Sequence, residues 1–397
     1  MAPVEDILPR FHALPAAAPL LAVLDEAPDV YVVGGAVRDL LLGGAPEDLD
    51  LVVEGDAIVL ARRLAEGLGG ELREHERFGT ATVVAGGHAY DLAGARAETY
   101  ARPGALPDVR PGTLEEDLRR RDFTVNAIAL GLDGRLVAVP AAFEDLAARR
   151  LRVLHEASFV DDPTRLLRLV RYATRLGFGV EPGTEALMRA AIAGGALATV
   201  TPTRVGMELR LLLLEANAPA ALAWVAAWEG ALGIPLSFDA GLASRACALL
   251  PDDGRRDLLL LAVACRGVAP AALAVWLDGL GFVGRERDVV VSAARADDLE
   301  GRLVAAACSS EIAAAVAGAP VEAVALAGAL GAEKPAARWI SDLRHVALAI
   351  DGGDLLAAGV PQGEAIGRGL AAALRARLDG EAPGRDAQLQ AALAAAR

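Results

Sequence analysis

The feature that most constrains the fold of this chain is a change in its residue pattern near position 150. Before that point, helical segments such as 56–68 separate short apolar runs of strand type, which lie at 30–33, 48–53, 80–86 and 88–93. From about residue 160 onward, Leu and Ala recur at helical spacing between Pro and Gly breaks. The pattern therefore predicts an α+β protein: a mixed α/β sheet domain followed by an all-helical remainder.

Composition limits the class of protein. A chain of 397 residues with 54% hydrophobic content can bury the cores of two or three domains. Charges interrupt its apolar runs before membrane length, and no basic segment leads into a long apolar one, so we expect a soluble cytoplasmic protein with no membrane partner. The scattered Cys247, Cys265 and Cys308 predict core thiols rather than disulfides or a zinc site.

The formal net charge is −14 at pH 7. This charge argues against a general polyanion-binding surface, although local basic clusters can override the total. On composition alone, nucleic acid would be an unexpected partner.

The segment "DLDLVVEGDA" (48–57) places Asp48 and Asp50 at alternate positions of an expected strand. Alternate residues project to the same side, so the two carboxylates would lie a few ångströms apart and repel each other. A cation between them removes that cost, and Mg²⁺ typically takes one or two carboxylates plus substrate phosphates. The pair predicts a metal clamp; the alternative is a strand end with both side chains in solvent.

The segment just upstream, "VYVVGGAVRDLLLG" (30–43), predicts a strand, a Gly-Gly turn and the start of a helix. Such a turn presents backbone N–H groups to an anion, and Arg38 adds a fork-shaped donor for phosphate. A plain tight turn is the alternative. Together with the carboxylate pair, a triphosphate cradle predicts nucleotidyl transfer, in which one metal ion activates a hydroxyl and a second steadies the leaving pyrophosphate.

A second cluster, "EEDLRRRDFTVNAIAL" (115–130), carries consecutive arginines before Asp122. Asp122 is an expected N-cap of a following helix. Either the segment is a charged turn that opens that helix, or one of its arginines reaches a bound nucleotide.

The third cluster, "VDDPTRLLRLVRYATRLGF" (160–178), predicts a helix with Asp161 or Asp162 as its cap and Pro163 at its first position. Asp162 and Arg165 stand three residues apart and share a face. They would form either a surface ion pair or a base-selecting pair. In the second case, the carboxylate accepts from the amino group of cytosine or adenine, and the guanidinium donates to the adjacent ring acceptors.

These motifs, in this order, resemble the class II tRNA nucleotidyltransferase and bacterial poly(A) polymerase family over roughly residues 30–215. The resemblance implies a polymerase-β-type nucleotidyltransferase head over 1–150 and a helical neck with a nucleotide-selecting helix over 151–215. It implies an all-helical, RNA-binding body and tail over 216–397. It also implies dependence on Mg²⁺.

The resemblance also assigns roles to residues. It makes Asp48 and Asp50 catalytic and metal-binding, with Asp91 as a candidate third carboxylate. It assigns nucleotide binding to Gly35, Arg38, Arg121, Asp162, Arg165, Arg168 and Arg171. By their three-residue spacing alone, Arg168 and Arg171 drift around the helix from Arg165 and would more naturally reach phosphates or RNA.

The function that the resemblance implies is template-independent addition of C and A to the 3′ end of tRNA from CTP and ATP. The segment 97–118 occupies the place of the family's flexible loop and is short and Pro-rich, which leaves open a CC-adding or A-adding enzyme. A poly(A) polymerase shares the same motifs, and an inactive RNA-binding relative is the alternative outside the class. The sequence has no feature that indicates an oligomeric state.

Overall fold

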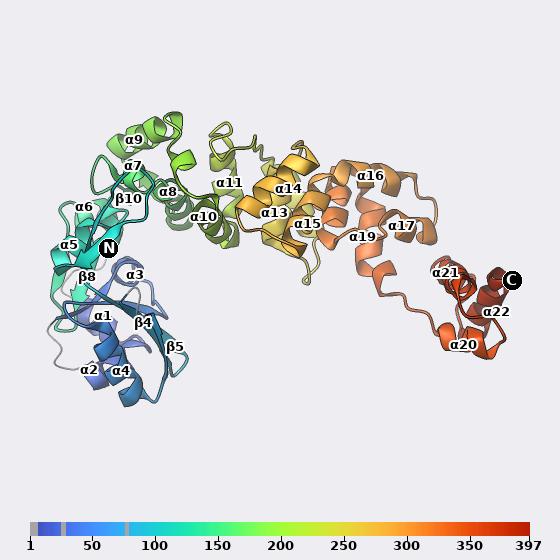
Figure 1. Cartoon of the computed structure of the whole chain (residues 1–397), viewed down its shortest axis with the longest axis horizontal. Coiled ribbons are helices and arrows are strands. Elements are labelled where there is room, and N and C mark those ends of the chain that lie inside the picture. The colour runs from blue at the N-terminus through green and yellow to red at the C-terminus, as the bar shows by residue number, and fades with distance from the viewer. Residues whose placement is uncertain (1–6, 25–28, 76–78) are drawn as a thin grey trace. The chain divides into compact units, whose positions relative to one another are not determined.

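The computed structural model describes residues 7–24, 29–75 and 79–397 (Figure 1). The chain separates into two compact units, Met1–Thr201 and Pro202–Arg397. In the first unit helices surround a sheet, whereas the described elements of the second are all helical. An α/β head and a helical remainder confirm the predicted α+β class.

The main sheet of the first unit has seven strands in the order β3-β4-β5-β2-β1-β8-β9. The strands are β1 (Val30–Val33), β2 (Leu49–Val53), β3 (Glu71–His75), β4 (Thr80–Ala85), β5 (His88–Gly94), β8 (Ile128–Gly131) and β9 (Leu136–Ala138). Only β2 and β5 pair in parallel, and their register sets Asp50 opposite Asp91. The sheet therefore carries a pair of adjacent carboxylates on neighbouring strands.

Helices and two small sheets complete the first unit. The helices before residue 150 are α1 (Ile7–His12), α2 (Ala17–Leu24), α3 (Gly35–Leu42), α4 (Ala57–Leu68), α5 (Leu114–Arg119) and α6 (Ala142–Ala147). The small sheets pair β6 (Arg96–Thr99) with β7 (Asp108–Pro111), and β10 (Arg150–Leu151) with β11 (Gly179–Val180). The segment 97–118 is thus a β-hairpin followed by α5.

Four helical elements close the unit: α7 (Ser158–Asp161), α8 (Arg165–Leu176), α9 (Pro182–Ala193) and a 3₁₀ turn at Ala196–Thr199. The predicted cap of α8 is wrong. Asp162 follows α7 as its C-cap, and its Oδ1 accepts hydrogen bonds from Thr164 N at 3.1 Å and Thr164 Oγ1 at 2.6 Å. Because the carboxylate serves this local turn, α8 begins later, with Thr164 at its N-cap and Pro163 ahead of it.

The second unit consists of helices from α10 (Pro202–Leu214) to α22 (Arg385–Ala396). Those between them are α11 (Ala218–Ala226), α12 (Ala240–Leu249), α13 (Arg256–Ala264), α14 (Pro270–Gly279), α15 (Arg285–Ala294), α16 (Ala296–Ala305), α17 (Ser309–Ala315), α18 (Val321–Ala327), α19 (Glu333–Ser341), α20 (Gly352–Ala357) and α21 (Glu364–Leu378). The apolar residues 258–264 of helix α13 are all buried.

The cysteines only partly fit the core-thiol prediction. Cys265 follows α13 and is fully buried, whereas Cys247 and Cys308 are half-buried. Both half-buried residues lie near helix ends, where alanine-rich sequence packs without enclosing every side chain. No helix among the described residues is long and apolar enough to span a membrane.

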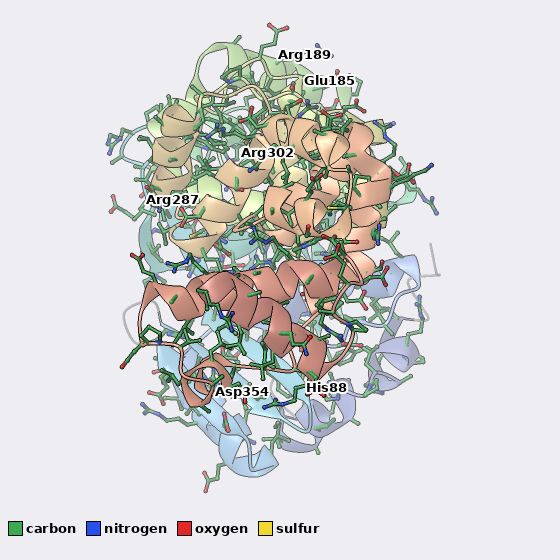
Figure 2. All side chains as sticks on the ribbon, turned by 90° about the vertical axis from the view of Figure 1, so that its right-hand side faces the viewer. His88, Glu185, Arg189, Arg287, Arg302 and Asp354 are labelled. Atoms are coloured by element: carbon green, nitrogen blue, oxygen red, sulfur yellow. The ribbon has the colours of Figure 1, made fainter. Side chains whose placement is uncertain are left out.

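Surface arginines in both units pair with neighbouring carboxylates. Arg189 Nη2 lies 2.5 Å from Glu185 Oε1 on α9 (Figure 2). In the second unit, Arg287 contacts Asp278 and Asp288. Such exposed pairs contribute little to stability. They do hold positive charge next to negative charge, which limits the extent of any purely basic surface.

Candidate functional site

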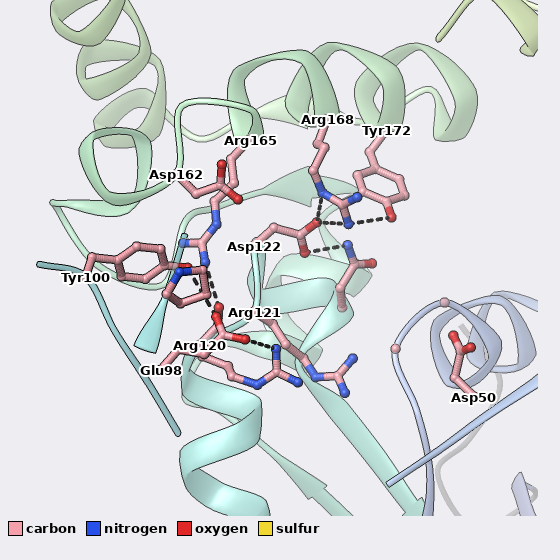
Figure 3. A pocket seen from close by; sticks show the side chains of 14 residues that line it. Asp50, Glu98, Tyr100, Arg120, Arg121, Asp122, Asp162, Arg165, Arg168 and Tyr172 are labelled. Atoms are coloured by element: carbon pink, nitrogen blue, oxygen red, sulfur yellow. Dashed lines mark hydrogen bonds and ion pairs between the residues drawn. The ribbon is translucent and has the colours of Figure 1, made fainter. Parts of the chain in front are cut away.

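A pocket of about 390 Å³ opens on the first unit (Figure 3). It lies among the β1–α3 turn, β2, the β6–β7 hairpin, the turn after α5, and α8. Its lining residues are Gly34, Gly35, Asp50, Glu98, Tyr100, Pro107, Arg120, Arg121, Asp122, Asn126, Asp162, Arg165, Arg168 and Tyr172. The three motif clusters, which are distant in sequence, thus meet around one cavity.

The predicted site residues divide into two groups. Those that line the pocket are Gly35, Asp50, Arg121, Asp162, Arg165 and Arg168, whereas Asp48, Arg38 and Arg171 do not line it. Asp48 is exposed just before β2. Arg38 and Arg171 are both buried.

The β1–α3 turn requires glycine at its first position. Gly34 has a φ of 71°, and a Cβ atom there would lie 2.9 Å from Arg121 Nη1. Arg121 also donates from Nη2 to Asp117 Oδ2 at 2.9 Å, and Asp117 is fully buried. The guanidinium of Arg121 is therefore fixed against the start of α3, where backbone N–H groups can bind an anion.

Negative charge gathers beside this turn. Crowding by protein atoms, together with the neighbouring Asp91 and Asp48, raises the pKa of Asp50, and Arg121 opposes that shift. Figure 3 shows Arg121 extending toward Asp50. Asp48 Oδ1 accepts from Ala89 N at 3.1 Å, which ties the carboxylate to the start of β5. The arrangement is a cluster of acidic side chains whose charge is only partly balanced.

The acidic cluster is not a complete metal cage on its own. Within the described ranges, no three His, Cys, Asp or Glu side chains come together closely enough to hold a metal ion. Asp91 instead accepts from Thr82 Oγ1 at 2.5 Å. Any ion bound by Asp48 and Asp50 would therefore draw further ligands from substrate or solvent, a common arrangement for Mg²⁺.

Arg38 lies beneath the pocket rather than on its wall. It is 1% exposed, donates from Nη1 to Asn126 Oδ1 at 2.6 Å, and donates from Nε to Asp39 Oδ1 at 2.9 Å. Its guanidinium carbon also lies 5.3 Å from the ring centre of Tyr172. In this structure the guanidinium is thus engaged with side chains, and direct contact with a phosphate would require it to move.

Asp122 does not cap a helix, in contrast to the prediction. The next residues form a single 3₁₀ turn (Thr124–Asn126) that leads into β8, because the β-branched and apolar residues that follow pack in the sheet. The Asp122 carboxylate accepts from Asn126 Nδ2 and from Arg168 Nε and Nη2. Burial alone would raise the pKa of Asp122, but Arg168 and the Asn126 hydrogen bond together lower it below its ordinary value.

Arg165 is not part of a surface ion pair, because only 4% of it is exposed. It donates from Nη1 to Ser158 Oγ at 2.8 Å and from Nη2 to the Arg120 carbonyl at 2.7 Å. Asp162 stands near it at the α7–α8 junction (Figure 3). Two residues with opposite hydrogen-bonding character therefore share the pocket wall that α7 and α8 supply.

The β6–β7 hairpin supplies side chains that the sequence reasoning missed. Tyr100 donates from its hydroxyl to Glu98 Oε2 at 3.1 Å, and Glu98 Oε1 accepts from Arg120 Nη1 at 2.8 Å. Burial, and the charges of Glu98 and Asp162, raise the pKa of Tyr100 to about 12 although Arg165 opposes them. Glu98 and Tyr100 stand at alternate positions, the same spacing that drew attention to Asp48 and Asp50.

The chain is similar to known proteins over part or nearly all of its length. A family model described as "Poly A polymerase head domain" matches residues 30–152. An A-adding tRNA nucleotidyltransferase of Halalkalibacterium halodurans is 42% identical over 53% of this chain and 51% of its own length. A CCA-adding enzyme of Limosilactobacillus fermentum is 29% identical over 94% of this chain and 95% of its own.

Among solved structures, the Thermotoga maritima CCA-adding enzyme complexed with tRNA superposes with a TM-score of 0.78 at 29% identity. The match covers 99% of this chain and 98% of that one. The chain spans only about half the length, or less, of the A-adding relatives that it matches at 42–44% identity. Residues 30–152 thus match the poly(A) polymerase head domain, and the chain is similar to curated and solved CCA-adding enzymes over nearly its whole length.

Proposed function

We propose that this protein adds C and A nucleotides to the 3′ end of tRNA, using CTP and ATP without a nucleic-acid template. The main support is one pocket whose lining joins the glycine turn, Asp50 and Arg121 to Asp162, Arg165 and Arg168. Full-length similarity to CCA-adding enzymes supports the same activity. In the proposed reaction, the 3′-hydroxyl oxygen of tRNA bonds to the α-phosphorus, and the bond from that phosphorus to pyrophosphate breaks.

The triphosphate would lie at the glycine turn. Backbone N–H groups from Gly35 onward and the guanidinium of Arg121 are the donors we assign to its oxygens. These donors are fixed before substrate arrives, because Gly34 and the buried Asp117 hold Arg121 in place. We assign Arg38 and Arg171, which are buried outside the lining, to supporting the nucleotide pocket.

The base would lie at the opposite wall. There the Asp162 carboxylate would accept from the amino group of cytosine or adenine, and Arg165 would donate to the neighbouring ring acceptors. Uracil and guanine present these groups in the reverse order. The hydrogen bonds of Arg165 to Ser158 and the Arg120 carbonyl fix the direction in which its remaining donors point.

Asp48 and Asp50 would hold Mg²⁺. The carboxylates fit this role, since the pKa of Asp50 is raised partly by Asp91 and Asp48, and a cation would relieve that repulsion. The bound ion would supply positive charge to the phosphate oxygens and to the leaving pyrophosphate. Asp91 would help to keep the local field negative.

The domain boundaries, the RNA-binding role of the helical part and the location of the protein were inferred from the sequence, and they stay predictions. These are the division into head (1–150), neck (151–215) and body and tail (216–397), the RNA-binding role of the helical part, and the cytoplasmic location.

A-only addition is the second candidate function. It is favoured by the 42% identity to an A-adding tRNA nucleotidyltransferase over about half of this chain. CC-only addition and poly(A) synthesis would use the same pocket.

Incorporation of labelled CTP and ATP, separately and together, into tRNA transcripts ending at the discriminator base, at C and at CC tests these candidates. Extension of all three transcripts, ending after one A, is the expected result. If CTP alone extends only the transcripts that end at the discriminator base and at C, the protein is a CC-adding enzyme. If ATP extends only the transcript that ends at CC, it is an A-adding enzyme. Long A tails on any RNA would indicate a poly(A) polymerase. If neither nucleotide is incorporated into any transcript, the proposed nucleotidyltransferase activity is contradicted.

A further inference from the structure

We propose that Asn126 is a positioning residue, which fixes Asp122 and, through it, orients Arg168 on the pocket wall. This inference rests on the proposed function, because Arg168 matters only if the pocket binds a nucleotide. It concerns a side chain that neither the motif reasoning nor the resemblance assigned to a role.

Hydrogen-bond partners on both sides fix the orientation of the Asn126 amide. Its Oδ1 accepts from Arg38 Nη1 at 2.6 Å, and its Nδ2 donates to Asp122 Oδ1 at 2.9 Å. Arg38 has only donors and the ionised Asp122 has only acceptors, so both neighbours demand the same amide orientation. The amide satisfies both neighbours at once, because it carries an acceptor oxygen and a donor –NH₂ group without being ionised.

The connection continues to the pocket wall. Asp122 Oδ2 accepts from Arg168 Nε at 2.9 Å and from Nη2 at 2.7 Å. Arg168 Nη2 also reaches the Tyr172 hydroxyl at 3.3 Å. The direction of the Arg168 guanidinium is therefore set by a carboxylate whose other oxygen accepts from Asn126 Nδ2 and from the backbone N–H of Phe123 at 2.8 Å.

Burial makes these contacts strong. The exposed fractions are 1% for Arg38, 5% for Asn126 and 7% for Asp122. Buried charged hydrogen bonds are costly to break, since water cannot replace the missing partner. Besides Asp122 and Arg168, the charged or titratable side chains around this network are Arg38, Asp39, Arg121, Arg165, Arg171 and Tyr172.

Asn126→Asp is the sharpest test, because it changes a single –NH₂ to oxygen. At alkaline pH the new carboxylate would face Asp122 across a hydrogen-bond distance and repel it. At acid pH the two carboxylates would share one proton, which restores a donor toward Asp122. We expect a nucleotide KM about tenfold to hundredfold above wild type at about pH 8.5, approaching the wild-type value toward pH 6. The turnover number should change less.

Two further variants separate positioning from folding. Asn126→Leu, of similar shape but without hydrogen bonds, should raise the nucleotide KM equally at both pH values. Arg38→Met removes the group that orients the amide and should raise the KM without recovery at acid pH. Asn217→Asp, at the only other asparagine in the chain, adds the same charge in the second unit and should leave the KM unchanged.

Nucleotide binding measured by calorimetry without tRNA, with the folded fraction from circular dichroism at each pH, keeps the two proposals apart. A wild-type protein that binds CTP or ATP but transfers nothing contradicts the proposed function alone. An active wild type combined with an Asn126→Asp variant whose KM follows wild type at every pH overturns the role of Asn126. So does an equal KM rise in Asn126→Asp and Asn126→Leu that persists at acid pH in folded protein.

Discussion

Asp50 and Asp91 face each other across the single parallel strand pair of the sheet, and Asp48 stands just ahead. Carboxylates that crowd together raise one another's pKa and attract cations. Burial among protein atoms raises the pKa of Asp50 most, and the charges of Asp91 and Asp48 raise it further, so a cation bound here would relieve the repulsion. The sheet register, which sets Asp50 beside Asp91, creates the part of this effect that comes from the carboxylates.

Replacing Asp48 by Ala should reduce nucleotide transfer by about a thousandfold, because transition-state charge loses its electrostatic partner. Binding of CTP or ATP to the pocket should survive at least partly, since the donors of the glycine turn and Arg121 are untouched. Single-turnover transfer and calorimetric binding measure the two effects. Asp56→Asn, which keeps the cap of α4, serves as the matched control. Full transfer activity by Asp48→Ala across a Mg²⁺ titration would contradict the assignment.

Tyr100 offers a prediction for pH. Its pKa in the folded protein is about 12, above the value of about 10 for an exposed phenol. The folded chain thus keeps a proton that the unfolded chain loses, so this group's contribution to stability is complete below pH 10 and is lost as pH rises toward 12. Tyr100→Phe should remove the corresponding part of the near-ultraviolet phenolate titration. A curve that is unchanged above about pH 11 would refute the assignment.

The sequence predicted which residues gather at the pocket better than it predicted how buried they are and which side chains they contact. It placed Asp50, Arg121 and Arg165 in one site, and all three line the pocket. It did not predict that Arg38 would be buried or that Asp122 would hold Arg168. Burial and partners depend on which distant segments pack together, and a local spacing carries no record of that.

At the scale of elements, the turn between β1 and α3 joins backbone geometry to the site. Gly34 has a φ of 71° and a ψ of −130°, a combination that residues with a Cβ rarely adopt, and Arg121 occupies the space that a side chain there would fill. The predicted strands at 30–33, 48–53, 80–86 and 88–93 and the helix at 56–68 match observed elements, because apolar patterns mark them. Strand β3, with the polar sequence ELREH, carries no such pattern and was missed.

Gly34→Ala should therefore weaken nucleotide binding by more than backbone strain alone would predict. This positive-φ conformation costs of order 1–3 kcal/mol for a residue with a Cβ, and the new methyl group also displaces Arg121. Gly69→Ala is the matched control, since its φ is 61° and a Cβ atom there would have no neighbour within 4 Å. We expect both variants to lose stability in thermal melts, but only Gly34→Ala to raise the nucleotide KM. Equal KM values would contradict the role of the turn.

At the scale of the whole molecule, each unit has its own core. In the second unit, α10 approaches the turn after α14 so closely that a Cβ on Gly206 would overlap the Leu280 carbonyl oxygen. The candidate nucleotide pocket, in contrast, is built from residues 34–172 of the first unit alone. Damage to the second core should therefore leave nucleotide binding intact.

Gly206→Ala tests this separation in the full-length protein. Hydrogen exchange should show lost protection in residues 202–397, while CTP binding and protection of the pocket residues stay near wild type. Gly367→Ala, on α21 with open space around it, should change neither the hydrogen-exchange protection of residues 202–397 nor CTP binding. Loss of nucleotide binding in Gly206→Ala would show that the two units share stability.

Because the pocket is confined to one unit, the two units can diverge independently in evolution. Substitutions beyond residue 201 can accumulate without touching the side chains that line the candidate nucleotide pocket. Conversely, a chimera joined at this border could exchange the chemistry of two relatives while keeping the helical part of each. The border at Thr201 and Pro202 is thus a natural crossover point for recombining family members in the laboratory.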